Sequence, residues 1–275
     1  MTDNAVAGNL RKMITRHDSP VRYELVLGEQ RVGVNEHLGK QVQLMFLGEI
    51  NCIHCSRKTS KSFNQGYCFP CMRSLAECDS CIVKPETCHF EAGTCRDPEW
   101  AKGHCFQDHY VYLANSSGVK VGITRGNQIP TRWMDQGATQ ALPIFRVKSR
   151  FISGLLEMEL KQHVSDRTDW RKMLKGVAEP VDLAAERQRL VAECQDAITS
   201  LSDRFGADAV VPLEEVVVEI DYPVLAYPDK VKSLNFDKDV LVEGTLEGIK
   251  GQYLILDKGV INMRKFGGYL VEFSA

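Results

Sequence analysis

Residues 109–124 read HYVYLANSSGVKVGIT, and the fold of the central part of the chain can be predicted from them. Two β-rich runs, 109–114 and 119–124, flank a Ser-Ser-Gly turn, which is typical of an antiparallel hairpin. A helix near 129–136 and a strand near 143–149 are expected to follow. The sequence therefore predicts a small antiparallel sheet with helices beside it.

After this sheet, the sequence predicts helices and then strands. Residues 152–164 carry apolar side chains at helical spacing. Residues 181–205 predict one long helix with Cys194 in its apolar stripe, where a free cysteine packs as a small hydrophobe. The last part of the chain alternates β-rich runs with glycine-containing turns and predicts a small all-β domain.

Two stretches, one toward each end of the chain, place similar residues in the same order. Residues 34–50 and 234–249 each place an asparagine near the start, then a strand, then Gly and Glu before Ile. Strands are also expected at 21–28 and 41–47. This likeness permits one terminal β-domain built from both chain ends, with everything else inserted between them.

The expected fold class is α+β, with a three-stranded antiparallel sheet and flanking helices at its centre. Five segments are predicted, and each has its own composition. They are an N-terminal β-element (1–51), a Cys-rich zinc-binding module (52–105), the central domain (106–178), a helical connector (179–206) and a C-terminal β-domain (207–275).

The amino-acid composition excludes two classes of protein. The 275 residues are 44% hydrophobic and 25% charged, which excludes a wholly disordered chain and a disulfide-stapled miniprotein. The net charge is only -2, but residues 106–175 hold 11 Lys and Arg against 6 Asp and Glu. If any part of the chain binds an anionic ligand by charge, we expect it to be this one.

The N-terminal twenty residues are charged where a signal peptide needs an apolar run, and no apolar stretch is long enough to cross a membrane. We therefore expect a cytoplasmic protein without a membrane partner. Thiols stay reduced in that compartment, so clustered cysteines indicate metal more often than disulfides.

Nine of the ten cysteines lie between Cys52 and Cys105. The first four form two Cys-x2-Cys pairs, a spacing typical of a closed, structural zinc site. The ligands of this predicted zinc are Cys52, Cys55, Cys68 and Cys71.

The next four cysteines predict a second zinc site with a less standard spacing. Its ligands would be Cys78, Cys81, Cys88 and Cys95. Exchange of a ligand with His89, His104 or Cys105 is one alternative, and an iron–sulfur cluster is another because four thiolates suit both cofactors. A zinc bound by four thiolates carries a formal charge of -2, so this module is as suited to a protein partner as to nucleic acid.

The order of motifs in the central domain resembles the GIY-YIG nuclease superfamily. Tyr110-Val111-Tyr112 corresponds to the first motif and Lys120-Val121-Gly122 to the second, over about residues 109–172. Together with the cysteine pairs, HYVYL, KVGIT, RW and DQGA also resemble a bacterial family known only as a domain of unknown function. That second likeness implies no activity.

The superfamily resemblance implies roles for several residues. Tyr112, with Tyr110 beside it, would activate water, Arg132 would stabilise the phosphoryl oxygens, and a glutamate of 152–164 would hold Mg²⁺ or Mn²⁺. Lys120 replaces the second-motif tyrosine, as in a phage-associated branch, and could contact phosphate.

The identity of the glutamate stays open between two motifs. Leu155-Leu156-Glu157 resembles the repair incision nucleases, whereas Glu159 and His163 resemble the Glu-x3-His of the phage-associated branch. At 100° per residue, Glu159 and His163 fall inside the apolar arc of the helix and Glu157 falls at its edge.

Two functions follow from these features. The first is a zinc-stabilised protein that binds DNA or RNA and hydrolyses its phosphodiester bonds with Mg²⁺ or Mn²⁺. The alternative is a non-catalytic adaptor that keeps the fold and binds nucleic acid or a protein through the zinc module. The lysine at position 120 favours the alternative, whereas Tyr112, Arg132 and the glutamates favour the nuclease.

Overall fold

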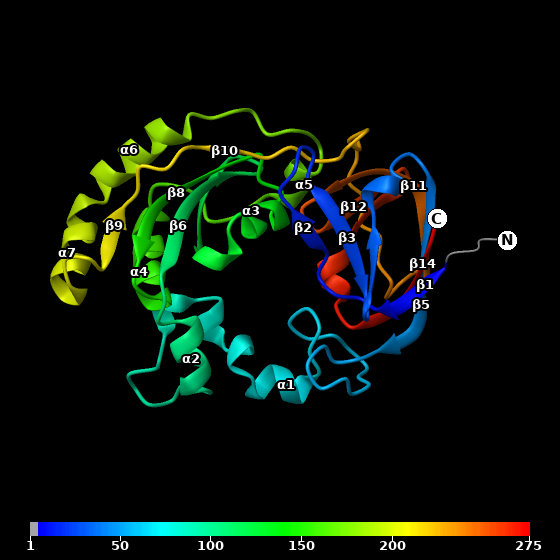
Figure 1. Ribbon diagram of the computed structural model, residues 1–275, viewed down its shortest axis with the longest axis horizontal. Coiled ribbons are helices and arrows are strands. Elements are labelled where there is room, and N and C mark those ends of the chain that lie inside the picture. The colour runs from blue at the N-terminus through cyan, green and yellow to red at the C-terminus, as the bar shows by residue number, and fades with distance from the viewer. Residues whose placement is uncertain (1–4) are drawn as a thin grey trace.

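Three antiparallel β-sheets organise the protein in the computed structural model, which describes residues 5–275 (Figure 1). Seven α-helices accompany the sheets in these residues, so the fold is mixed α+β, as the sequence predicts. In Figure 1 the central sheet and its helices lie on the left, the sheet of the chain ends on the right, and the Cys-rich segment below.

The largest sheet is built from both ends of the chain. Its strand order is β1-β14-β5-β11-β12-β13, and a direct pairing places Leu241 opposite Met45. The two stretches with a similar layout thus contribute strands that are neighbours. The strands of this sheet are β1 (Val6–Asn9), β5 (Gln41–Ile50), β11 (Leu241–Lys250), β12 (Tyr253–Leu256), β13 (Gly259–Asn262) and β14 (Tyr269–Ser274).

A small sheet packs against this one. Its strands are β2 (Ile14–Arg16), β3 (Arg22–Leu27) and β4 (Gln30–Gly33). Alternate side chains of β3, namely Tyr23, Leu25 and Leu27, are buried, as expected for a strand with one face on a core. They belong to the same apolar core as the large sheet.

The central sheet has β6 in its middle and contains the predicted hairpin. Residues 109–124 form β6 and β7 with Tyr112 directly opposite Gly122. The sheet order is β10-β8-β6-β7, and β9 pairs with β8. The strands are β6 (His109–Asn115), β7 (Val119–Arg125), β8 (Gln140–Val147), β9 (Val210–Pro212) and β10 (Val218–Glu219).

The two faces of β6 pack against different cores because successive side chains point to opposite faces. Val111 and Leu113 join a core with α4 (Arg150–Leu160), α6 (Leu183–Glu193) and α7 (Gln195–Phe205). Tyr112 and Ala114 face the other way. They share the core of the terminal sheets and α3 (Thr131–Asp135).

The expectation of one long helix over 181–205 is wrong. The helix ends at Glu193 and restarts at Gln195, because Cys194 has φ -101° and ψ 13° and serves both as the C-cap of α6 and as the N-cap of α7. Cys194 is nevertheless buried in the core, as predicted.

The Cys-rich segment runs below the two larger parts of the molecule, from the terminal sheet to the central sheet (Figure 1). Its first half, residues 52–71, is bound to the terminal sheet: Asn51 N–H donates to the Gly268 carbonyl over 2.8 Å, and the Ser62 hydroxyl donates to the Gly267 carbonyl over 2.8 Å. Helices α1 (Phe69–Ser74), α2 (Pro98–His104) and α5 (Trp170–Met173) are all short.

The second half, residues 79–105, packs on α4 of the central domain. Gly154 of α4 lies so close to this half that a Cβ there would be 2.7 Å from the Glu86 nitrogen and 2.7 Å from Pro85 Cβ. The first half of the segment therefore rests on the terminal sheet and the second half on helix α4 of the central domain.

Within residues 5–275, none of the helices combines the length and apolar character needed to cross a lipid bilayer.

Candidate metal centre and cationic cleft

The first four predicted zinc ligands come together. The ligand atoms of Cys52, Cys55, Cys68 and Cys71 all lie within 4.8 Å of one another, and the Sγ atoms of Cys55 and Cys68 are 3.8 Å apart. Zinc bound by four thiolates at about 2.3 Å holds their sulfur atoms about 3.8 Å apart in a tetrahedron. These residues therefore fit a structural zinc ion.

The local backbone prepares this site for a metal. Burial disfavours the thiolate of Cys52, but the backbone N–H groups of Cys55, Cys68 and His54 favour it and lower the pKa of Cys52 to about 6. A low pKa supplies the deprotonated sulfur that zinc requires. All ten cysteines are free thiols, so no disulfide competes for these ligands.

The second predicted set does not assemble as expected. In the described part of the chain, no group of three or more ligand atoms within 4.8 Å of one another contains Cys78. Cys78 does not line the small pocket that contains Cys81, Cys88 and Cys95. Burial raises its pKa, and the charges of Glu77 and Cys52 add to that rise. Its place beside Cys81, Cys88 and Cys95 is taken by Cys105, since these four cysteines line one small pocket.

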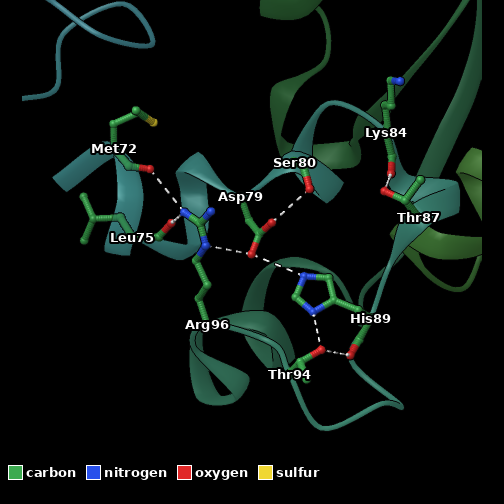
Figure 2. A network of polar contacts seen from close by, with 9 residues as sticks. All are labelled: Met72, Leu75, Asp79, Ser80, Lys84, Thr87, His89, Thr94 and Arg96. Carbon is green, nitrogen blue, oxygen red and sulfur yellow. Dashed lines mark hydrogen bonds and ion pairs between the residues drawn. The ribbon is translucent and has the colours of Figure 1, made fainter. Parts of the chain in front are cut away.

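Asp79, Cys81 and His89 form a second close group. Two of these residues, Asp79 and His89, form a polar clamp with Arg96 (Figure 2). Asp79 Oδ2 already accepts from Arg96 Nε over 2.9 Å and lies 3.3 Å from His89 Nε2. The other ring nitrogen of His89 is 2.8 Å from the Thr94 hydroxyl. Because both ring nitrogens and this carboxylate oxygen are engaged, the clamp holds the loops that carry the cysteines.

A cleft of about 530 Å³ lies where the central sheet, the Cys-rich segment and the terminal domain meet. Tyr112 of β6, Lys120 of β7, Arg132 of α3 and Glu157 of α4 all line it. Four residues singled out from the sequence for the resemblance thus share one wall.

Tyr112 is held rigidly in this cleft. A Cβ on Gly122 would lie 2.6 Å from the Tyr112 hydroxyl oxygen, so the ring fits only because its cross-strand partner is glycine. The hydroxyl donates to Gln136 Oε1 over 3.3 Å. Burial raises the pKa of Tyr112, and the positive charge of Arg132 opposes that rise.

Lys120 donates a hydrogen bond to the same Gln136 oxygen. Its side chain is 5% exposed, and burial, aided by the charge of Arg132, lowers its pKa to about 8. Asp166 and Glu157 act in the opposite direction. Burial also raises the pKa of Glu157, against the pull of Lys161, whose Nζ is 3.5 Å from a Glu157 oxygen.

The acidic side chains of the cleft are paired with cations outside its wall. Asp79 pairs with Arg96, and Glu77 lies 3.9 Å from the His54 ring. Lys161 contacts both Glu157 and Asp166, at 3.5 and 3.1 Å.

The arginines of the cleft, by contrast, have no carboxylate within 4.0 Å among the residues that the structure describes. Each comes from a different element. They are Arg125 of β7, Arg132 of α3, Arg150 of α4 and Arg264 of the short 3-10 helix Met263–Phe266. The cleft therefore carries an excess of positive charge.

Three candidate residues lie away from this wall. Glu159 is exposed and accepts from Gln162 over 2.9 Å, and His163 Nδ1 is 2.9 Å from a Glu193 oxygen of α6. The placement of Glu159 in the apolar arc is therefore wrong, because that part of α4 faces solvent. Tyr110 packs instead over Gly126, where a Cβ would be 2.8 Å from its ring.

The comparisons with known proteins identify a family for this chain but no function. A family model described as "Protein of unknown function (DUF2797)" matches residues 39–271. The chain belongs to this family. No curated protein and no solved structure matches it.

The residues of this DUF2797 chain that the sequence interpretation missed are Gln136, Arg150 and Arg264. Gln136 follows α3 and accepts from both Tyr112 and Lys120. Arg150 follows the N-cap residue Ser149, which would indicate only a helix start. Arg264 reaches the cleft from the terminal domain, so no local pattern could have indicated it.

Another cleft of the DUF2797 chain, of about 490 Å³, serves as a contrast. Its wall contains Asp18, Glu219 and Asp221 but no lysine or arginine. An anionic ligand would therefore bind in the cationic cleft and not here.

Proposed function

We propose that this protein binds nucleic acid in the cationic cleft and cleaves its phosphodiester bonds with Mg²⁺ or Mn²⁺. The observation that carries the proposal is the convergence of Tyr112, Lys120, Arg132 and Glu157 on one wall. These residues come from four elements, and the resemblance to GIY-YIG nucleases named each of them separately. The strand order β7-β6-β8, with α3 and α4 beside it, agrees with that resemblance.

The charge of the cleft supports a phosphate-bearing ligand. The four arginines lack carboxylate partners among the described residues, whereas the acids nearby are paired elsewhere. Guanidinium groups bind phosphate oxygens in a fork geometry. A nucleic-acid backbone would supply the anions that these side chains lack.

The chemistry that we assign to each side chain follows from its position. Arg132 stabilises the phosphoryl oxygens, and Lys120 contacts a neighbouring phosphate. Tyr112 orients and activates the attacking water, with its hydroxyl fixed by Gln136 and its ring fixed against Gly122. Glu157 fits as the protein ligand of a divalent ion, since Mg²⁺ needs only one or two carboxylates and retains its waters. The bound ion would neutralise charge that develops on the phosphate.

A specific observation favours a second candidate, the non-catalytic adaptor. The Tyr112 side chain is 0% exposed, and Lys120 occupies the second-motif tyrosine position with its ammonium on Gln136. A protein that keeps the fold for binding alone would tolerate both features. In that case nucleic acid, or a protein bound through the zinc module, would occupy the surface without being cleaved.

The deciding experiment measures binding and cleavage separately. Branched, single-stranded and duplex DNA and RNA are incubated with the full chain and Mg²⁺ or Mn²⁺. We expect Arg132→Ala and Glu157→Gln to lower the cleavage rate by about 10²- to 10³-fold, the size of the loss when one transition-state donor is removed. Arg146→Ala is the matched control, because Arg146 pairs with Asp108 at 2.9 Å outside the cleft.

Binding without cleavage by the wild type would support the adaptor. Loss of cleavage in Glu157→Gln with retained binding would support the nuclease. If neither binding nor cleavage occurs at about 50 mM salt, where phosphate contacts are strong, the nucleic-acid proposal is wrong.

A further inference from the structure

Four cysteines line one pocket in the second half of the Cys-rich segment, and their geometry differs from that of the zinc site. They are Cys81, Cys88, Cys95 and Cys105. In the described residues no three of their sulfur atoms lie within 4.8 Å of one another, whereas those of the first site all do. The four thiols thus surround a space instead of converging on a point.

That space is lined mainly by side chains of the second half of the Cys-rich segment. The rest of the wall is largely apolar and aromatic, with Phe90 and Phe106 in contact at 4.6 Å between ring centroids.

We infer that Cys81, Cys88, Cys95 and Cys105 hold a cubane iron–sulfur cluster. In such a cluster each thiolate binds a different iron atom, so the four sulfur atoms stay further apart than when they share one zinc ion. Four thiolates around an apolar pocket match this requirement. Cys78 does not line this pocket and is therefore left out of the inferred ligand set.

The polar clamp fixes three of the four ligand loops (Figure 2). Asp79 lies two residues before Cys81, and its two partners follow the other ligands directly: His89 follows Cys88, and Arg96 follows Cys95. Arg96 also donates to the carbonyls of Met72 and Leu75 over 3.1 Å. Outer contacts of this kind orient the ligands of a metal site.

The fourth ligand loop is fixed by the central domain. The Cys105 carbonyl accepts from the Arg150 N–H over 2.8 Å, and the Arg150 guanidinium donates to the Ile82 carbonyl beside Cys81. The inferred cluster therefore lies against an arginine that also lines the cationic cleft. The inference does not depend on the proposed nuclease activity.

The test is anaerobic purification of the full chain from iron-supplemented cells, with iron, acid-labile sulfide and zinc measured together. We expect a broad visible absorbance, about four iron and four sulfide per chain, and about one zinc from the first site. Cys105→Ser should lower the iron content by about ten-fold or more and keep the zinc. Cys78→Ser is the matched control and should keep both metals.

Several results would overturn the inference. About two zinc and no iron per chain would assign zinc to the pocket, and iron without sulfide would exclude a cluster. Loss of iron in Cys78→Ser with retention in Cys105→Ser would restore the ligand set predicted from spacing. If Cys105→Ser does not fold, the iron, sulfide and zinc contents of the wild type decide the question alone.

Discussion

The two halves of the Cys-rich segment each bring four cysteines together, but the spacing of the thiols differs between them. In the first half, four thiols lie within 4.8 Å of one another and the loops are bound to the terminal sheet. In the second half, four thiols line a pocket, and the loops are held by Asp79 and rest on α4. The two groups therefore differ in the separation of their sulfur atoms and not in the number of cysteines. The cationic cleft lies between the two halves.

The largest effect on metal content and stability is expected from removing one thiol of the first half, residues 52–71. Zinc contributes about 10–16 kcal/mol to the folding of finger peptides, so Cys68→Ser should abolish zinc binding and unfold residues 52–71. Metal analysis and urea denaturation measure both consequences. Cys78→Ser, whose thiol lies outside both groups, should leave zinc content and the urea midpoint unchanged. Retention of zinc by Cys68→Ser would refute the four-thiol site.

A smaller effect is expected from substitutions that disturb the contact of each half with the part of the protein on which it packs. Gly154→Ala places a Cβ 2.7 Å from the Glu86 nitrogen, and Gly267→Ala places one 2.3 Å from the Gln65 carbonyl oxygen. Overpacking of this kind typically costs about 1–3 kcal/mol.

Limited proteolysis distinguishes the two changes. Gly154→Ala should expose residues 79–105 to cleavage and spare 52–71, and Gly267→Ala should do the reverse. Gly103→Ala is the control, because a Cβ there meets no atom within 4 Å. Equal cleavage of both halves in either variant would show that they are one unit.

The smallest effect concerns Lys120 in the cleft between the halves. Its ammonium faces Arg132, Asp166 and Glu157, and its pKa is lowered to about 8. As pH rises from 7 to 9, Lys120 loses its charge, and the slope of log affinity for nucleic acid against log salt should become shallower by about 0.9. Lys120→Arg should keep a constant slope. A wild-type slope that does not change with pH would contradict this.

The lowered pKa of Lys120 also changes how the free energy of unfolding depends on pH. The pKa of Lys120 is about 8 in the folded chain and about 10.4 in the unfolded chain. Between these values the unfolded chain binds more protons, so the contribution of Lys120 makes the unfolding free energy rise with pH.

Local pattern was enough to predict the central hairpin and the grouping of the first four cysteines. The Ser-Ser-Gly turn and its β-rich flanks predicted strands at 109–114 and 119–124, and the structure has them at His109–Asn115 and Val119–Arg125. Paired Cys-x2-Cys turns likewise carry their geometry in a few residues. Such features need no distant contact to form.

Features that depend on distant contacts could not be predicted. Cys105 lines the pocket of the second half, where the N–H of Arg150 in α4 binds its carbonyl, whereas Cys78 is nearer in sequence to Cys81, Cys88 and Cys95 but does not line that pocket. Arg264 enters the cleft from the other end of the chain. The helix break at Cys194 interrupts an apolar stripe that continues through it, so the periodicity gave no signal.

The shared terminal sheet has a consequence for the order of synthesis and folding. Strand β5 leaves the ribosome long before its partners β11 and β14, and Val6 pairs with Phe273. Contacts between residues near in sequence form sooner than such remote pairings. We therefore expect the hairpin and the cysteine-containing loops to form on the nascent chain before β5 pairs with β11 and β14.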